Sequence, residues 1–177
     1  MKRRRSLPVV LAVLALAITG AASMALAGVG DRLDRARDAT RQFKDLAVAT
    51  EAGYGKFYVC TDNEGVGGMG QHYVNGDLVA DPRLRIRHPE VLVYEPTASG
   101  GSRLVAVEYV VFQADWDALH PNPPKLFGRT LALLPAGNRY GLPAFYELHV
   151  WLFKSNPLGR FNDWNPRVSC RGQGDPA

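Results

Sequence analysis

Apolar and polar positions alternate most clearly over residues 146–152 (YELHVWL). Side chains of a β-strand point alternately to its two faces, so this pattern predicts a strand with one apolar face and one mixed face. A strand that places a carboxylate and an imidazole among large apolar residues indicates either a functional site or a costly polar core. The mixed face carries Glu147, His149 and Trp151, and the apolar face carries Tyr146, Leu148, Val150 and Leu152.

Four earlier segments are also predicted to be strands, because each is rich in β-branched and aromatic residues and lies between turn residues. Asn75-Gly76, followed by Leu78-Val79, predicts a turn that brings the chain back as a hairpin. The last two segments are predicted to pair as a second antiparallel hairpin. The four segments are residues 56–60, 71–74, 91–95 and 103–112.

The strand predicted over residues 103–112 is the longest of these, and it contains one acid, Glu108. A carboxylate inside the run LVAVEYVVF needs a partner, and the sequence shows none beside it. The alternation predicts that Leu104, Ala106, Glu108 and Val110 share one face, while Val105, Val107, Tyr109 and Val111 share the other.

Residues 31–52 predict a single helix, because apolar positions repeat there at steps of three and four residues. Its apolar stripe is narrow and rich in alanine, so the helix is expected to lie closely on a sheet. Residues 113–144 contain five prolines and predict a long ordered loop with one short element around residues 127–134. Strands that follow one helix without βα alternation predict an α+β fold, in which the N-terminal helix packs on an antiparallel, barrel-like sheet.

The first 27 residues have the pattern of a secretory signal peptide, with a basic start, an apolar segment and the ending Ala25-Leu26-Ala27. A retained anchor helix is the alternative, but the apolar run is short for one. The leader holds four of the 21 basic residues and none of the 17 acidic ones, so its removal takes the formal charge from +4 to zero. The basic balance is therefore no sign of a nucleic-acid partner or an acidic membrane.

The sequence thus predicts an exported protein, secreted or in the cell envelope, with no stable membrane anchor after cleavage. Residues 28–170 are expected to form one globular domain, and residues 171–177 a flexible tail. Cys60 and Cys170 are the only cysteines. Outside the cytoplasm an even count predicts one disulfide, which would tie the start of the domain to its end. Two free buried thiols are the alternative.

Metal-ligand side chains occur once on each of four predicted strands. They are His72, Glu95, Glu108, and Glu147 or His149. Buried carboxylates and imidazoles are paired, protonated or bound to a cation, so convergence of these residues would suit zinc, iron, manganese or copper. The alternatives are buried pairs, His72 with Glu108 and His149 with Glu95, or side chains that face solvent. No HExxH or other metal motif accompanies the set.

Two other features have both a functional and a structural interpretation. The glycine-rich segment 64–70 (EGVGGMG) would be a mobile lip over a pocket, or a place where backbones pass closely. Five aromatic residues would form a sugar-stacking platform, or core packing, which is the commoner role of aromatic side chains. They are Trp116, Tyr140, Tyr146, Trp151 and Trp164.

The segment Asn138–Cys170 resembles the C-terminus of a family of uncharacterised exported bacterial proteins, which has the form YELHVW…NP.G.F.DWN.RVSC. The likeness extends to ATRQFKDLAVATEAGYG, MGQHYVN and PEVLVYEP with LVAVEYVV, and so covers most of the chain after the leader. The resemblance implies export and one compact domain. It implies no activity and assigns no functional residue.

Three functions remain open from the sequence. The first is a binding or interaction module with a polar His/Glu cluster on its sheet. The second is a metal-dependent enzyme or metal-binding protein that uses His72, Glu95, Glu108 and His149 with a divalent transition metal. The third is a metal-free small-ligand protein with an aromatic pocket, in which Glu147 and Trp151 join the ligand-binding set.

Overall fold

The structure is a computed structural model that describes residues 28–171. The predicted signal peptide and all but the first residue of the predicted tail lie outside this range. None of the described helices is long and apolar enough to cross a membrane.

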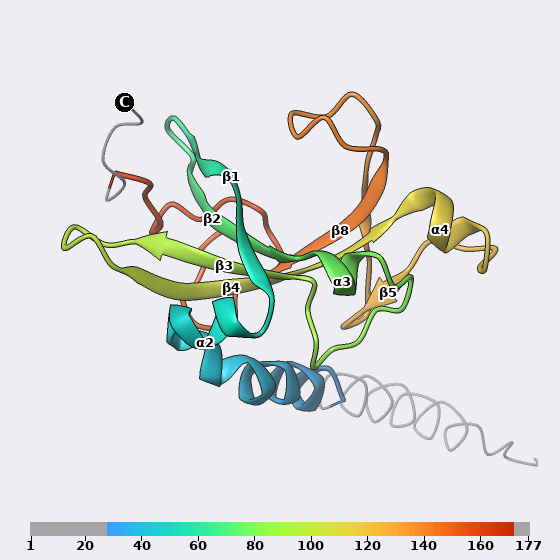
Figure 1. The fold of residues 1–177 in the computed structure, drawn as a ribbon, viewed down its shortest axis with the longest axis horizontal. Helices are drawn as coiled ribbons and strands as arrows, with labels where there is room; N and C mark the ends of the chain where they lie inside the picture. Colours follow the sequence, from blue (N-terminus) through green and yellow to red (C-terminus); the bar gives the residue numbers. More distant parts are fainter. Residues whose placement is uncertain (1–27, 172–177) are drawn as a thin grey trace, which may run out of the picture.

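Within the described residues the fold is α+β, as the sequence predicts. An antiparallel sheet has the strand order β1-β2-β3-β4-β8-β7 and curls into half a barrel (Figure 1). Its strands are β1 (Tyr54–Asn63), β2 (Gly67–Asn75), β3 (Val91–Pro96), β4 (Ser102–Phe112), β7 (Ala132–Leu134) and β8 (Phe145–Val150). A separate small ribbon consists of β5 (Lys125–Leu126) and β6 (Arg129–Thr130).

The prediction of one continuous helix over residues 31–52 is wrong in one respect, because the helix is interrupted in its middle. Residues 28–40 are helical, followed by the 3₁₀ turn η1 (Arg41–Lys44) and the short helix α2 (Leu46–Glu51). Asp45 is extended between them, and its side chain accepts a hydrogen bond from the Ala47 amide at 2.9 Å. This cap starts a new helix, and Phe43, in the 3₁₀ turn before it, is buried in the core.

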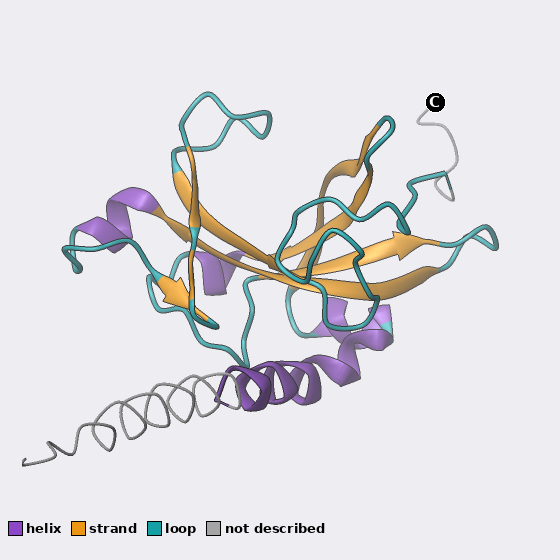
Figure 2. Cartoon of the chain, turned by 180° about the vertical axis from the view of Figure 1, so that it is seen from behind, coloured by secondary structure: helices purple, strands orange, loops and turns teal. Residues whose placement is uncertain are grey.

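The helix lies across the convex side of the curled sheet (Figure 2). Leu33, Ala36 and Phe43 pack there against inward-facing residues of the central strands, and three tyrosines reach from the sheet into this layer. Each tyrosine hydroxyl donates to a backbone carbonyl: Tyr54 to Pro89 at 2.7 Å, Tyr94 to Phe43 at 2.6 Å and Tyr109 to Ile86 at 2.7 Å. The convex layer is thus both apolar and fully hydrogen-bonded at these groups.

The hairpin expected around Asn75-Gly76 is absent from the described residues. Asn75 instead caps the short helix α3 (Gly76–Val79), because its side chain accepts from the Asp77 and Leu78 amides. β2 pairs with β1 and β3 rather than with residues 78–79. The hairpin expected from residues 91–95 and 103–112 is confirmed as β3 and β4.

The glycine-rich segment mostly belongs to β2, and its interpretation as a close backbone approach is confirmed. A Cβ on Gly67, which has φ 131°, would lie 2.3 Å from the carbonyl oxygen of Asn165. Gly68 donates its amide to the carbonyls of Asn165 and Val168. Only glycine lets the C-terminal segment lie this close to the strand.

The longest strand, β4, contains one β-bulge, at which the alternation of its side chains between the two faces is reversed. Val93 lies opposite Ala106 but Tyr94 lies opposite Leu104, so Val105 is an extra residue in β4. This bulge puts Leu104 in the convex core and Val105 with the concave residues, and the faces predicted for these two are wrong. The faces predicted for the rest of the strand, including Glu108, are right.

Strand β1 is irregular at its middle. Phe57 lies opposite His72 and Thr61 opposite Gly70, so β1 has two residues more than β2 across this interval. Tyr58 has φ 56°, and the Gln71 side-chain amide donates to the carbonyls of Phe57 and Tyr58 at 2.9 and 3.0 Å. Phe57 lies before the irregularity and keeps its place opposite His72 on the concave side, and the rings of Phe57 and Tyr58 both contact Tyr140.

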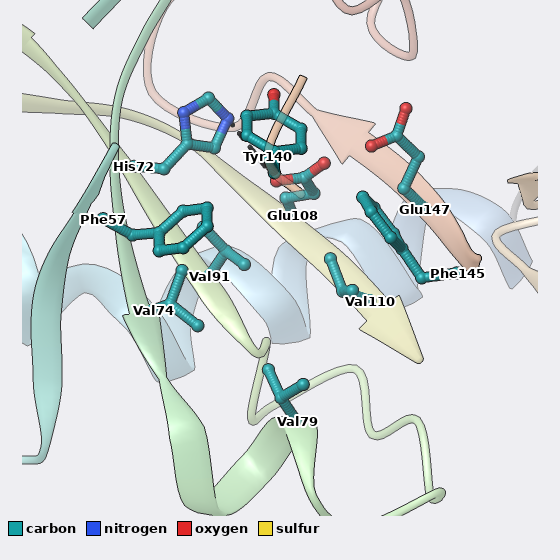
Figure 3. Close-up of a pocket in the computed structure, with 10 residues that line it drawn as sticks. All are labelled: Phe57, His72, Val74, Val79, Val91, Glu108, Val110, Tyr140, Phe145 and Glu147. Atoms are coloured by element: carbon teal, nitrogen blue, oxygen red, sulfur yellow. Dashed lines mark ion pairs between the residues drawn. The ribbon is translucent and has the colours of Figure 1, made fainter. Parts of the chain in front are cut away.

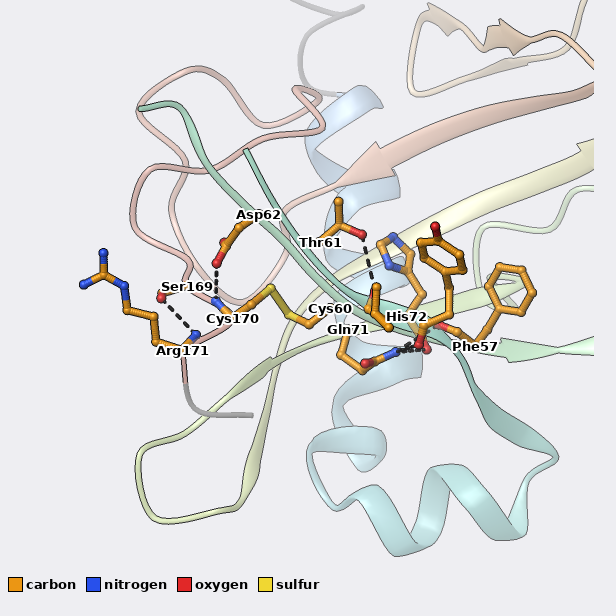
Figure 4. The surroundings of a disulfide bond; sticks show 11 residues. Phe57, Cys60, Thr61, Asp62, Gln71, His72, Ser169, Cys170 and Arg171 are labelled. Atoms are coloured by element: carbon orange, nitrogen blue, oxygen red, sulfur yellow. Dashed lines mark hydrogen bonds between the residues drawn. A yellow bond between two sulfur atoms is a disulfide. The ribbon is translucent and has the colours of Figure 1, made fainter. Parts of the chain in front are cut away.

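The expected disulfide is present between Cys60 in β1 and Cys170, which are 110 residues apart (Figure 4). The Cys170 amide also donates to the Asp62 carboxylate at 3.0 Å. The C-terminal segment is therefore fixed to the first hairpin of the sheet. The disulfide indicates an oxidising environment, as outside the cytoplasm.

Candidate metal centre

A buried polar cluster lies on the concave side of the sheet, away from the helix. Glu108 on β4 lies directly opposite His149 on β8. His72 lies on β2, two strands away from Glu108 and in the neighbouring row of paired residues. In that row His72 lies opposite Val93 on β3, and Val93 lies opposite Ala106 on β4. Because the sheet curls toward this side, the three side chains meet above these smaller residues.

The three functional groups of the cluster are close enough to share one cation. A ligating atom from each of His72, Glu108 and His149 lies within 4.8 Å of the other two. The shortest described separation is 3.5 Å, from His72 Nε2 to Glu108 Oε2 (Figure 3). All three residues are buried, with 7%, 6% and 1% of their surface exposed, respectively.

His149 is the least satisfied member of the cluster. Neither Nδ1 nor Nε2 has a hydrogen-bond partner among the described residues, although both atoms are buried. Its ring is held by Trp151, at a centroid distance of 4.6 Å, and it meets the ring of His72 edge-on at 6.0 Å. Trp151 is in turn fixed by donating its indole N–H to the Asn162 carbonyl at 2.6 Å. The imidazole is thus rigidly placed, yet its polar atoms are unused.

Glu147 adds a second carboxyl to the cluster. It lies next to Glu108 on the concave side, and the two carboxyl groups share a hydrogen bond. Burial raises the pKa of Glu108 well above 4.5, and the adjacent Glu147 charge raises it further. Burial also raises the pKa of Glu147. A proton shared by two carboxyls resolves the repulsion that two adjacent charges would cause.

Both histidines are neutral over the physiological range. Burial lowers the pKa of His72 from 6.5 to about 4. Burial lowers the pKa of His149 well below 6.5, and the neighbouring His72 acts in the same direction. Metals bind the neutral imidazole, so no proton has to leave either ring before coordination.

Glu95 does not belong to this cluster, which corrects the predicted metal set. Both of its oxygens accept from the Lys154 ammonium at 2.7 Å. The side chain lies near the far end of β3, where Glu95 pairs in register with Arg103. Of the two buried pairs considered as alternatives, His72 with Glu108 is present and His149 with Glu95 is not.

Of the two interpretations of the five aromatic residues, the structure does not form the sugar-stacking platform. Tyr146 packs in the convex core and its hydroxyl donates to Asp117, whereas Trp151 packs on the concave side. Trp116, in the short helix α4 (Gln113–Asp117), contacts His120 instead. The five aromatic residues therefore share no common face.

A small pocket opens beside the cluster and contains residues that the sequence did not single out. It has a cavity volume of about 50 Å³. Phe57 and Phe145 contribute to its wall without having been predicted as site residues, and Tyr140 had been considered only for stacking. The cluster side chains His72, Glu108 and Glu147 form its polar end, and Phe57, Val74, Val79, Val91, Val110, Tyr140 and Phe145 form the remainder (Figure 3).

The sequence pattern identifies the face on which the pocket residues lie, but their grouping becomes visible only when the register of the strands is known. Val74, Val91, Glu108 and His149 form one row across four strands. The period-two pattern gives the face on which each of them lies. It does not give the row, which depends on how the strands pair.

Comparisons with known proteins add no precedent for this site. No protein-family model matches the chain, and neither a curated protein nor a solved structure matches it. The chemistry of the cluster is therefore inferred from the distances, burial and hydrogen bonding of its own side chains.

Proposed function

We propose that this is an extracytoplasmic metal-binding protein in which His72, Glu108 and His149 hold one divalent transition metal ion. The observation that carries the proposal is the buried imidazole of His149, whose two nitrogens have no hydrogen-bond partner in the described part of the chain. A buried polar atom without a partner lowers stability by about 1–3 kcal/mol. A metal ion bound to one nitrogen would remove part of this penalty.

The spacing of the ligand atoms supports the proposal. Ligands about 2.1 Å from a tetrahedral ion lie about 3.4 Å apart. His72 Nε2 and Glu108 Oε2 are 3.5 Å apart, and the third ligand atom lies within 4.8 Å of each. Two imidazoles and one carboxylate suit Zn²⁺, and they are also the ligand set of non-haem Fe²⁺ sites. Three protein ligands leave at least one coordination position for a small molecule from the adjoining pocket.

Glu147 is placed to support such a centre. Its hydrogen bond to Glu108 would orient the ligating carboxylate, as outer-shell partners commonly do. Because it also lines the pocket, its carboxylate would lie near a water molecule or ligand bound at the open position. A carboxylate at that position is suited to accept a proton. An enzymatic role of the metal centre would use Glu147 as this base.

The signal-peptide pattern and the disulfide support the extracytoplasmic part of the proposal. The first is a sequence pattern over residues 1–27. The second requires an oxidising environment to form and persist. Together they favour a protein that folds and binds its metal after export.

The proposal is tested by metal analysis of the oxidised protein without its leader. Protein incubated with Zn²⁺, Mn²⁺, Fe²⁺ or Co²⁺ and then desalted should retain one ion per chain. Glu108→Gln should lower the affinity for the ion by at least about tenfold, because a charged ligand becomes a neutral one. Glu95→Gln is the matched control, since it removes an acid of the same sheet that lies outside the cluster.

Two results would contradict the proposal. One is that no metal is retained by the folded wild-type protein. The other is equal loss of affinity in Glu108→Gln and Glu95→Gln, which would mean that the ion binds elsewhere.

A metal-free small-ligand pocket is the second candidate. The shared proton of Glu108 and Glu147 favours it, because the proton reduces the charge of the pair from two to one without a cation. In that case the unpaired nitrogens of His149 would bind the ligand directly. The same metal analysis separates the two candidates.

A further inference from the structure

The pocket beside the cluster has a polar end and an apolar end (Figure 3). His72, Glu108 and Glu147 form the first, and four valines line the second. A cavity of about 150 Å³ binds benzene, and one water molecule takes about 30 Å³ of liquid. The cavity volume of about 50 Å³ therefore favours a chain of two or three carbon atoms over an aromatic ring.

A cation without a salt bridge among the described residues lies over the ring of one residue that lines this pocket. The exposed guanidinium of Arg139 lies 5.9 Å from the ring of Tyr140, which lines the pocket, and 5.7 Å from the ring of Trp164. It forms no salt bridge with the described residues. The arginine is thus held by two aromatic faces while its N–H donors remain available.

The loop that carries Arg139 is fixed by its neighbour Asn138. The Asn138 side-chain amide donates to the carbonyls of Pro135 and Leu142, both at 2.9 Å. Its oxygen accepts from the amides of Tyr140 and Leu142, both at 3.2 Å. Four hydrogen bonds from one side chain hold the loop in place, so Arg139 is presented to the pocket from a defined position.

The charges at the polar end favour an anion. A divalent ion bound by two neutral histidines and the Glu108 carboxylate keeps one positive charge, which an ionised Glu147 would cancel. Arg139 adds a further positive charge, so the polar end stays positive in either case. The buried and apolar surroundings strengthen the attraction between these charges and a bound anion. A carboxylate matches both partners, because it binds a metal through oxygen and accepts two parallel hydrogen bonds from a guanidinium.

We propose that the pocket binds a short-chain aliphatic carboxylate, whose carboxylate group lies between the metal position and Arg139 and whose hydrocarbon tail lies among the valines. This inference rests on the proposed metal centre and names the class of molecule that occupies its open position. Val74, Val91 and Val110 contact the tail. Tyr140 separates the tail from solvent and supports the guanidinium.

The test uses the Co²⁺-loaded, oxidised protein, because the visible spectrum of Co²⁺ reports a change in its ligands. Propionate should change the spectrum with saturation. Propionamide has nearly the same shape without the charge, and it should bind at least about tenfold more weakly, since hydrogen bonds to charged groups are the stronger ones. Octanoate should also bind more weakly than propionate, because its tail exceeds the cavity.

Arg139→Gln should lower propionate affinity by about tenfold or more and leave Co²⁺ affinity unchanged. Arg129→Gln is the matched control, because Arg129 also lies over an aromatic ring, that of Phe161 at 5.4 Å, and Phe161, unlike Tyr140, does not line this pocket. Equal affinities for propionate and propionamide would overturn the inference, as would equal effects of the two arginine variants.

The outcomes separate this inference from the proposed function. A protein that binds one Co²⁺ but whose spectrum does not respond to propionate retains its metal centre and loses the carboxylate ligand. A folded protein that binds no Co²⁺ loses both.

Discussion

The two sides of the central sheet treat their buried polar groups differently. On the convex side, Tyr54, Tyr94 and Tyr109 each donate to a backbone carbonyl. Glu90 accepts there from the Val110 amide at 3.1 Å, an amide left without a strand partner because β3 begins at Val91. On the concave side, His149 has two buried nitrogens without any partner among the described residues.

This difference is the one expected between polar groups that support the fold and polar groups that bind a ligand. A buried group that is paired with the backbone stabilises one conformation of the chain. A buried group that is left unpaired destabilises the fold, and such groups concentrate where a ligand completes the pairing. The convex groups are therefore expected to determine stability, and the concave groups to determine binding.

Removing the disulfide should cause the largest loss of stability, and this loss should be independent of the polar groups on either side of the sheet. Cys60→Ser with Cys170→Ser opens a loop of about 110 residues and should lower the free energy of unfolding by about 4–5 kcal/mol on the chain-entropy model. Denaturation with and without metal measures it. Thiol titration of the unfolded, unreduced wild type should find no free thiol, and two per chain would contradict the pairing.

The next prediction compares one variant on each side of the sheet. His149→Leu removes the unpaired nitrogens while keeping an apolar side chain, so stability without metal should stay within about 1 kcal/mol of wild type or rise. Its metal affinity should fall by at least about 100-fold, since even outer-shell changes lower affinity by about 10–100-fold. Tyr109→Phe should behave in the opposite way, with a stability loss of about 1–3 kcal/mol and unchanged metal affinity.

Chemical denaturation of both variants, with and without Zn²⁺, measures this contrast. A loss of 1–3 kcal/mol in His149→Leu that is identical with and without metal would make His149 a structural residue. Loss of metal affinity in Tyr109→Phe would show that the two sides are coupled.

A pH dependence that belongs to the convex side gives the last contrast. Burial raises the pKa of Glu90 from 4.5 to about 8. The folded protein then holds a proton that the unfolded chain releases near pH 4.5. Stability from this group is full below about pH 4.5 and is lost as the pH rises toward about 8, with a slope of at most about 1.4 kcal/mol per pH unit.

Glu90→Gln should flatten this part of the stability profile in metal-free and metal-bound protein alike. The difference from wild type isolates Glu90, because the contributions of Glu108, Glu147 and the two histidines are present in both proteins. Parallel profiles for the two proteins between pH 5 and 8 would show that the burial of Glu90 does not control its protonation.

Local patterns in the sequence predict the face of the sheet on which a residue lies better than they predict its neighbours on that face. Alternation assigns Glu108 and His149 to correct faces, and the occurrence of one metal-ligand side chain on each predicted strand adds His72. The same criterion adds Glu95, which belongs to the same strand as Val91 and Val93 but lies too far along it. The ammonium that pairs with Glu95 comes from Lys154, 59 residues later, and no local pattern reports such a contact.

Two further errors have a similar origin. The bulge at Val105 reverses the face of Leu104, and it arises from pairing with β3 rather than from any residue in β4 that signals a break. The helix break at Asp45 does have a local signal, since aspartate is a preferred cap. The apolar repeat continues through it, so periodicity alone predicts one helix.

The irregularity of β1 also affects the tendency of the protein to self-associate. β1 is an outer strand of an open sheet, and its side chains Tyr58 and Val59 are 45% and 55% exposed. An exposed edge of this kind is a template for another copy of the chain. The left-handed backbone at Tyr58 and the two additional residues before Thr61 interrupt the row of amides and carbonyls that a second strand would need. The distortion beside the aromatic contacts of Phe57, Tyr58 and Tyr140 thus also makes the edge a poor template for aggregation.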